Sequence, residues 1–574
     1  MEKKKINIGN SDFIEIIRSN YYYVDKTMMI KELIDSGSKA LLFTRPRRFG
    51  KSLNMSMLKA FFEKNPDTTD LFQDLNIWQC GERYRTEQGK YPVIYLSFMD
   101  FSSSDWKSAM DYFKVCISTL YDYFSKSLNL DEFAEGESAY YKAVQLEQAN
   151  IEQLKVSLKR LTYFITQKCG IKPILLIDEY DKPVQKAQSS GYYNEMIDFM
   201  KGFYTGGLKD NMNLTKGILT GVLRIAKESI FTGMNNFDVY SVFSDQYSAY
   251  FGFIEEEVQE MAAIYGTLQD MAEIKSWYNG YSYGTDEIYN PWSVLQYYAK
   301  GRVAEAYWLS TSGNDIIHIM LQNMPVSMMK DLTDLVQGKH VDATIPLELA
   351  YPDIGKAKPG NNLYAMLLMT GYLKKINEKK LGGDERTGQN LKYRCKLMIP
   401  NREIMEVYQA EILEYFELYC KPEVSDAIQR AIRMNDVETL QEELSVFLME
   451  STSNFDSAYE VFYHGLIMGS VAMMREGYYV ASNLESGEGR FDIQLEPKRN
   501  TLPGIVIELK SLKEKYKDSV TRDSHLEKEA EHALDQIMKN EYTANLKMRG
   551  VKDIFLYGMA FNGKHVKVKS KVLT

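Results

Sequence analysis

Residues 41–52, LLFTRPRRFGKS, combine an apolar strand, a tight turn and the start of a helix. The turn ends in Gly50-Lys51-Ser52, which is how a Walker A loop ends. In such a loop, N–H groups at the helix N-terminus hold phosphates, Lys51 reaches the β and γ oxygens, and Ser52 holds Mg²⁺. Arg45, however, occupies the place of the first Walker glycine. A basic turn that caps a helix is therefore the alternative.

A second apolar strand, residues 174–178, ends in a pair of carboxylates, as a Walker B strand does. Asp178 would hold Mg²⁺ through water, and Glu179 would orient and polarise the attacking water. Ligands of parallel sheets gather at the carboxyl ends of the strands, where these side chains lie. The two stretches together predict a nucleoside triphosphate site with Glu179 as its catalytic residue.

The first 240 residues alternate short apolar strands with helical patterns, which predicts a mostly parallel α/β sheet. The strands are expected at residues 40–44, 93–98, 174–178 and 217–222. The last of them contains Thr220 and is followed by Arg224. In ATPases with an additional strand, this position supplies a polar group near the γ-phosphate. Thr220 is thus a sensor candidate and Arg224 a candidate for contacting transition-state charge, unless they are a plain strand-end hydroxyl and a surface arginine.

Further motifs accompany these strands: Tyr23-Val24-Asp25-Lys26-Thr27, Ile177-Asp178-Glu179-Tyr180-Asp181, Asn235-Asn236, Phe251-Gly252-Phe253, Trp277-Tyr278-Asn279-Gly280-Tyr281 and Tyr289-Asn290-Pro291-Trp292-Ser293. With them, residues 5–300 resemble the AAA-ATPase-like family of bacterial proteins, which carries Arg-Pro-Arg-Arg-Phe in its own phosphate loop. The resemblance implies a P-loop fold of the additional-strand (ASCE) type that binds ATP and Mg²⁺. The nucleotide-binding residues that it implies are Arg45, Pro46, Arg47, Arg48, Phe49, Gly50, Lys51, Ser52, Asp178, Thr220 and Arg224.

A second group of polar residues interrupts apolar strands near the C-terminus. Gly489-Arg490-Phe491-Asp492 is followed by residues 505–510, IVIELK, which contain Glu508 and Lys510. Side chains alternate along a strand, so Glu508 and Lys510 share a face that Asp492 could reach from a hairpin neighbour. Two carboxylates and a cation around Mg²⁺ are what a metal-dependent nuclease needs. An edge strand whose polar side chains face water is the alternative.

The order of elements around these residues, from about 455 to 562, resembles the PD-(D/E)XK nuclease domain, a restriction-endonuclease-like α/β fold. The flanking motifs are Phe462-Tyr463-His464-Gly465 and Ala533-Leu534-Asp535-Gln536-Ile537. The resemblance implies that Asp492 and Glu508 bind Mg²⁺ or Mn²⁺ and that Lys510 positions water or stabilises the phosphorane. It also implies Glu460 as an additional ligand and Gln536 as an orienting residue. His464 is interpreted as a packing residue.

The composition along the chain predicts four domains: a P-loop ATPase domain (1–240), a mainly helical lid or middle domain (241–378), a helical connector (379–454) and a nuclease-like domain (455–574). A polar stretch at 379–390 predicts a loop or a hairpin. The aromatic clusters at 277–292 are interpreted as core and turn residues rather than a surface on which bases stack.

Charge and cysteine content limit the class of protein. The net charge is −9, so no global basic field indicates nucleic-acid binding. The last thirty residues form a basic stretch that is either a solvated tail or a DNA-facing surface: Lys547, Arg549, Lys552, Lys564, Lys567, Lys569 and Lys571. Five cysteines without a CxxC pair and the lack of a long apolar run predict a cytoplasmic protein without a membrane segment.

Two functions from different classes fit these patterns. The first is an ATP-regulated, Mg²⁺-dependent nuclease that acts on nucleic acid, DNA rather than RNA, in defence or in the processing of mobile elements. The second is a nucleotide-switched binding or scaffold protein whose nuclease fold is inactive. A motor-like homo-oligomeric ATPase is a third, weaker reading, since no arginine stands out as a finger supplied in trans.

Overall fold

The computed structural model describes residues 4–574 apart from 66–67, 129, 225–236, 309–330, 333, 337, 350–359, 384–390, 420–421, 452–459, 473, 475–476, 483–484, 487–488, 491, 500, 513 and 515. The chain divides into two compact units. The first unit comprises residues 1–312 and 342–404, and the second comprises 313–341 and 405–574. The predicted domain boundaries at 240, 378 and 454 stay predictions.

A five-stranded sheet with the order β2-β3-β4-β1-β5 forms the centre of the first unit, and all of its strand pairs are parallel. Its strands are β1 (Ala40–Thr44), β2 (Val93–Ser97), β3 (Ile174–Asp178), β4 (Lys216–Gly221) and β5 (Phe237–Tyr240). The four strands expected from the sequence are confirmed to within a residue, whereas the short β5 was not predicted. Because β4 lies between β1 and β3, the sheet has the additional strand of an ASCE-type P-loop fold.

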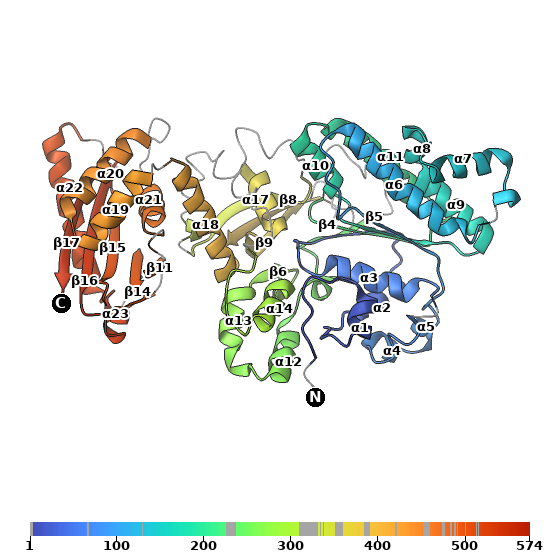
Figure 1. The fold of residues 1–574 in the computed structure, drawn as a ribbon, viewed down its shortest axis with the longest axis horizontal. Coiled ribbons are helices and arrows are strands. Elements are labelled where there is room, and N and C mark those ends of the chain that lie inside the picture. The colour runs from blue at the N-terminus through green and yellow to red at the C-terminus, as the bar shows by residue number, and fades with distance from the viewer. Residues whose placement is uncertain are drawn as a thin grey trace. The chain divides into compact units, whose positions relative to one another are not determined.

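Helices cover both faces of this sheet, as the right-handed crossovers between parallel strands require (Figure 1). On one face lie α1 (Phe13–Arg18), α2 (Met28–Asp35) and α3 (Lys51–Phe62), and on the other lie α6 (Trp106–Ser125), α9 (Ser157–Cys169) and α11 (Tyr193–Leu208). The remaining helices before β4 are α4 (Asn76–Gln79), α5 (Glu82–Arg85), α7 (Glu135–Gln145), α8 (Ile151–Lys155) and α10 (Lys182–Ser190). Burial on both faces explains why β1 and β3 are apolar along almost their whole length.

The region after β5 contains more strand than expected. Its helices are α12 (Glu255–Tyr265), α13 (Met271–Tyr278), α14 (Pro291–Ala299) and α17 (Gly360–Thr370). Its strands are β6 (Tyr281–Tyr283), β7 (Asp286–Ile288), β8 (Val341–Pro346), β9 (Lys374–Gly382) and β10 (Lys392–Met398). The polar stretch at 379–390 is a hairpin, since β9 and β10 pair antiparallel. The described residues at the start of the predicted helical connector (379–454) are thus strand and not helix. In β10 buried apolar residues alternate with polar ones, which is the pattern of a strand with one buried face.

Helices and a mixed sheet make up the described part of the second unit. The amphipathic helices expected between 401 and 450 are confirmed as α18 (Arg402–Tyr419), α19 (Pro422–Met434) and α20 (Val437–Ser451). They precede α21 (Glu460–Ala472), and α22 (Ser519–Lys539) and α23 (Ala544–Met548) follow later. The sheet order is β11-β14-β15-β16-β17, formed by β11 (Tyr478–Ser482), β14 (Ile493–Pro497), β15 (Gly504–Ser511), β16 (Ile554–Asn562) and β17 (His565–Leu573).

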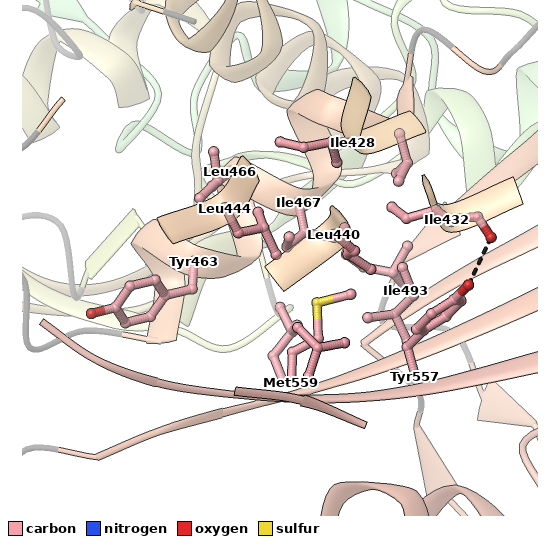
Figure 2. Close-up of a cluster of buried hydrophobic side chains, with 14 of the residues drawn as sticks. Ile428, Ile432, Leu440, Leu444, Tyr463, Leu466, Ile467, Ile493, Tyr557 and Met559 are labelled. Carbon is pink, nitrogen blue, oxygen red and sulfur yellow. Dashed lines mark hydrogen bonds between the residues drawn. The ribbon is translucent and has the colours of Figure 1, made fainter. Parts of the chain in front are cut away.

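The two faces of β15 have different neighbours. Ile505 and Ile507 belong to an apolar cluster with residues of α19–α21, in which the Tyr557 hydroxyl donates to the carbonyl of Ile432 at 2.8 Å (Figure 2). The intervening Val506 packs on the opposite side with residues of α22 and α23. Since side chains alternate along a strand, Glu508 and Lys510 also lie on the α22 side. Helix α22 crosses β16 closely, because a Cβ on Gly558 would lie 2.1 Å from the carbonyl oxygen of Ala530.

The basic stretch at the C-terminus is not a solvated tail. Residues 565–573 form β17, which pairs antiparallel with β16 along its whole length. Val566 and Val568 are buried, and the lysines alternate with them. This period of two is the ordinary pattern of a strand with one buried face. The number of lysines alone does not distinguish such a strand from a solvated tail. Lys569 forms an ion pair with Glu527 of α22.

No helix among the described residues is both long enough and apolar enough to span a membrane.

Candidate functional sites

The loop between β1 and α3 places backbone N–H groups at the carboxyl edge of the first sheet. Gly50 caps α3 with φ of 81°, a left-handed conformation that favours glycine, and Arg48 is also left-handed with φ of 70°. Lys51 begins the helix and is only 4% exposed. Its Nζ donates to the carbonyl of Pro46 at 3.0 Å and lies 3.4 Å from Oε1 of Glu179. The ammonium is thus held over the loop by one carbonyl and one carboxylate.

Two hydroxyl side chains from different elements meet at Asp178, which is fully buried at the end of β3. Ser52 Oγ donates to Oδ2 of Asp178 at 2.6 Å, and Thr220 Oγ1 donates to Oδ1 at 2.5 Å. Burial and the nearby charge of Glu179 raise the pKa of Asp178 above its usual range. A carboxylate with two hydroxyls supplies the hard oxygen ligands that Mg²⁺ prefers, so these residues fit that ion.

Glu179 projects from a strained position immediately after β3. Its φ is 53°, which a non-glycine residue adopts rarely, and its N–H donates to Oδ1 of Asp178 at 3.1 Å. Such strain is typical of residues whose direction matters for function. The carboxyl group lies beside Lys51 and at the wall of the pocket described below.

Three of the arginines that are expected from the sequence to bind the nucleotide do not reach the side chains around Asp178 in the structure. The Arg45 guanidinium is fully buried, donates to the carbonyls of Thr44 and Tyr240 at 2.9 Å, and lies against aromatic rings. Burial lowers the pKa of Arg45 to about 10. Arg224 forms an ion pair with Glu348 at 3.0 Å, and Arg47 is exposed. In this conformation Arg45 holds the loop to β5, which explains how a loop without the first Walker glycine is positioned.

Next to the loop lies a pocket of about 320 Å³. Residues 48–54 and Glu179 form one end of its wall. Most of the rest comes from residues within four distant segments, 7–11, 22–26, 250–253 and 291–295, together with Ile16 and Met99. Trp292 belongs to the last of these, and the Arg48 guanidinium lies 4.8 Å from the centre of its ring. From the sequence, this tryptophan is expected to be a core or turn residue, because a turn motif surrounds it. Nothing local indicated that α14 brings the ring to the phosphate loop.

A buried carboxyl group lies near this pocket and was not predicted. Glu403, at the start of α18, is fully buried and accepts hydrogen bonds from Ser293 Oγ at 2.8 Å and from the N–H of Trp308 at 2.9 Å. Burial raises the pKa of Glu403 to about 7, against an opposing effect of these hydrogen bonds and of Arg48.

The raised pKa predicts that the first unit loses stability as the pH rises. Between about 4.5 and about 7 the folded state keeps a proton on Glu403 that the unfolded chain has released. Above pH 7 the ionised group therefore costs on the order of 3 kcal/mol. Glu403→Gln is expected to remove this part of the pH dependence and to gain stability relative to the wild type between pH 5 and 8.

Denaturant unfolding followed by tryptophan fluorescence measures this effect in the first unit, because all five tryptophans lie there: Trp78, Trp106, Trp277, Trp292 and Trp308. Glu256→Gln, at an exposed position on α12, serves as the control and should keep the pH dependence of the wild type. Equal pH dependence in the wild type and in Glu403→Gln would contradict the prediction.

The second site lies at the junction of β14, β15 and α22. Asp492 precedes β14, and its Oδ2 accepts the N–H of Leu509 at 2.8 Å. Glu508, at 3% exposure, receives Lys510 Nζ at 3.2 Å on Oε1, the same oxygen that accepts Nε2 of Gln536. Lys510 Nζ also donates to Oε1 of Gln536 at 2.7 Å. The structure thus brings together four of the five residues that the sequence assigned to this site, Asp492, Glu508, Lys510 and Gln536.

Electrostatics and unsatisfied atoms at this second site are consistent with a divalent cation. Burial and the charge of Asp492 raise the pKa of Glu508 to about 8, and burial raises the pKa of Asp492 as well. Glu508 Oε2 is buried and has no hydrogen-bond partner within the described residues. A buried carboxylate oxygen without a partner is costly and suits a metal ligand. The described residues contain no group of three or more His, Cys, Asp or Glu side chains arranged for a metal ion.

Several predicted residues of the sites lie wholly or partly outside the described structure. Glu460 begins α21, but its side chain is not described, and its role as a ligand stays a prediction. Phe491 and the Asn235-Asn236 motif also fall outside the described residues. His464 lies with Nε2 3.2 Å from the carbonyl oxygen of Asp492, and burial lowers the pKa of the imidazole. This contact supports its interpretation as a packing residue that holds the end of the β14 hairpin.

Two regions of the chain match known protein families. Residues 7–231 match the AAA-ATPase-like family, described as a predicted AAA-ATPase, and residues 458–571 match the PD-(D/E)XK nuclease superfamily. A protein of Azotobacter chroococcum mcd 1, named "Uncharacterized protein in vnfD 5'region", is 28% identical over 442 residues, which are 76% of this chain and 74% of that relative.

The fold and the first site define a P-loop NTPase of the additional-strand type, and the mixed sheet with the second site defines a nuclease-like domain. The chain carries an AAA-ATPase-like domain followed by a C-terminal domain of the PD-(D/E)XK nuclease superfamily.

Proposed function

We propose that this chain binds and hydrolyses ATP with Mg²⁺ and that its C-terminal domain cleaves nucleic acid, DNA rather than RNA, with Mg²⁺ or Mn²⁺. The observation that carries the proposal is the meeting of Lys51, Ser52, Asp178, Glu179 and Thr220 at one edge of a parallel sheet. These five residues come from helix α3, the end of β3 and strand β4, so their meeting depends on the fold.

Each residue at the ATP site has a distinct role in this proposal. Lys51 binds the β and γ oxygens, and the N–H groups of α3 bind the remaining phosphate charge. Mg²⁺, when bound, neutralises developing charge on the phosphates, and Ser52 and Asp178 are the residues that would hold it. Glu179 orients the attacking water and accepts its proton. Thr220 positions Asp178 through their hydrogen bond.

At the nuclease-like site, Asp492 and Glu508 would hold the metal ion, which lowers the pKa of water and stabilises charge on the phosphate. Lys510 positions the attacking water and lies close to the charge of the transition state. Gln536 orients both Glu508 and Lys510, since it donates to the first and accepts from the second.

We further propose that nucleotide occupancy controls the nuclease-like domain and that residues 241–378 act as the lid of the ATP site. We also propose a cytoplasmic role in defence or in the processing of mobile elements, which the pairing of these two domains supports. Assembly into a homo-oligomer is a separate proposal, which sedimentation with Mg-ATP tests.

A nucleotide-switched scaffold with an inactive nuclease fold is the second candidate. It is favoured by the small number of ligands, since only two carboxylates, Asp492 and Glu508, meet within the described residues. This candidate predicts ATP binding with slow turnover and no metal binding at Glu508.

Lys51→Ala is expected to weaken ATP binding by about 10- to 100-fold, because charge-assisted hydrogen bonds to phosphate are lost. Calorimetric titration with Mg-ATP measures the change. Lys59→Ala, at a partly exposed lysine on the same helix, is the matched control and should bind ATP as the wild type does. Unchanged affinity in a folded Lys51→Ala protein would refute the phosphate site.

A further inference from the structure

The pocket beside the phosphate loop combines an apolar wall with residues of the loop itself. Its wall is mostly aromatic and aliphatic away from residues 50–54, with Tyr22, Val24, Phe253, Trp292 and Leu295 among the lining residues. Its volume of about 320 Å³ lies within the range of small-molecule sites. It is also continuous with the residues that would bind the phosphates, since Lys51 and Ser52 line it too.

We propose that this pocket receives the nucleoside end of the triphosphate and that Trp292 is the surface on which the base stacks. The inference rests on the proposed function of the phosphate site and adds the residues that select the ligand. Trp292 lies outside the segment that matches the AAA-ATPase-like family, residues 7–231. The base would therefore be bound by a part of the chain that the family match does not include.

Two neighbours of the ring and its partial exposure make Trp292 part of the same site as the phosphate loop. The guanidinium of Arg48, from the loop, lies over its ring at 4.8 Å. A Cβ on Gly9 would lie 4.0 Å from its Cζ3 atom, so the N-terminal segment also borders the ring. The indole remains only partly buried, which leaves surface for a planar partner. Stacking of a base on an aromatic ring is a frequent mode of nucleotide binding and contributes substantially to affinity.

Two asparagines on the pocket wall offer polar groups to the edge of the base. Asn7 Nδ2 donates to the carbonyl of Asn10 at 3.0 Å, and Asn10 Oδ1 accepts the N–H of Asp12 at 2.8 Å. These bonds orient both amides and leave Asn7 Oδ1 and Asn10 Nδ2 without a partner among the described residues. An acceptor beside a donor can pair with the 6-amino group and N1 of adenine or, with the roles exchanged, with the N1–H and O6 of guanine. Both purines are therefore expected to bind, and stacking on Trp292 is the contribution that the experiment isolates.

The experiment compares ligands that do and do not carry a base. The full-length chain is titrated calorimetrically with Mg-ATP, Mg-GTP and magnesium tripolyphosphate, as wild type, Trp292→Ala, Trp292→Phe and Trp277→Ala. Trp277 is the matched control, because it is another partly buried tryptophan that packs on the same apolar cluster but does not line the pocket. Thermal unfolding of each variant establishes that it is folded.

Trp292→Ala is expected to lower ATP affinity about tenfold or more and to leave tripolyphosphate affinity unchanged. Trp292→Phe should recover most of the loss, Trp277→Ala should behave as wild type, and Trp292→Ala should lower GTP affinity by a similar factor. ATP affinity within twofold of wild type in Trp292→Ala would overturn the proposal. An equal loss for ATP and tripolyphosphate would also overturn it, since the ring would then act only through the loop.

The failure of the phosphate site gives a different result. If the wild type binds neither ATP nor tripolyphosphate, the proposed ATPase function fails. If it binds tripolyphosphate as tightly as ATP, the phosphate site stands and the nucleoside pocket is refuted.

Discussion

Replacing Glu179 with glutamine is expected to slow ATP turnover by about 10²- to 10³-fold while ATP affinity stays within about threefold of wild type. Glutamine preserves the size of the side chain but cannot accept a proton from the attacking water. The left-handed backbone at this position, with φ of 53°, aims the side chain toward Lys51 and the pocket. Phosphate release measures turnover, and calorimetry measures binding.

Glu195→Gln is the control for this change, because it makes the same substitution at an exposed position on α11 of the same unit. It should hydrolyse ATP at the wild-type rate. Turnover that is unchanged in Glu179→Gln would exclude this carboxyl group as the general base. Loss of binding together with turnover would instead indicate that the contact with Lys51 shapes the loop.

Glu508→Gln is expected to reduce cleavage of nucleic acid by about 10³-fold or more and to weaken Mn²⁺ binding at the second site. The amide is similar in size to the carboxylate but lacks the charge that a divalent ion requires. Plasmid and single-stranded substrates, each with Mg²⁺ or Mn²⁺ and with or without ATP, provide the assay. Calorimetric titration with Mn²⁺ measures the site directly.

The matched control is Glu496→Gln on the neighbouring strand β14, whose carboxyl pairs with Arg549 away from the site. It should cleave as the wild type does. Full cleavage by Glu508→Gln would exclude the proposed nuclease site. A wild type that neither cleaves nor binds Mn²⁺ would favour the scaffold candidate, and ATP binding would still stand on the separate evidence of Lys51.

Local patterns were enough to predict the two sites in outline. Lys51 and Ser52 lie in one turn, and Asp178 and Glu179 lie at one strand end. Residues that are adjacent in the sequence are therefore enough to predict a phosphate-binding site. Parallel strands bring their carboxyl ends to one edge of the sheet, so the sequence alone predicts that Ser52 and Asp178 lie close together. The contact of Glu508 with Lys510 follows in the same way from the alternation along a strand.

Other features could not be predicted, because they depend on segments that are far apart in the chain. Arg45 lies in the phosphate loop, but its guanidinium is buried against the end of β5 at Tyr240 and against Phe251, which follows that strand. Trp292 has the surroundings of a turn residue, and only the position of α14 places it beside Arg48. Glu403 looks like an ordinary helix-start carboxylate until burial raises its pKa.

The amino-acid sequence thus determines the class of the protein, the two phosphate-chemistry motifs and most of the strands that carry them. The physical reason is that hydrogen-bonding pattern, strand alternation and helix capping act over a few residues. Tertiary packing decides which cations face the ligand, which carboxyl groups are buried and which side chains complete the pocket. Burial and long-range contact are properties of the assembled core, so the role of Arg45 and the place of Trp292 emerge only there.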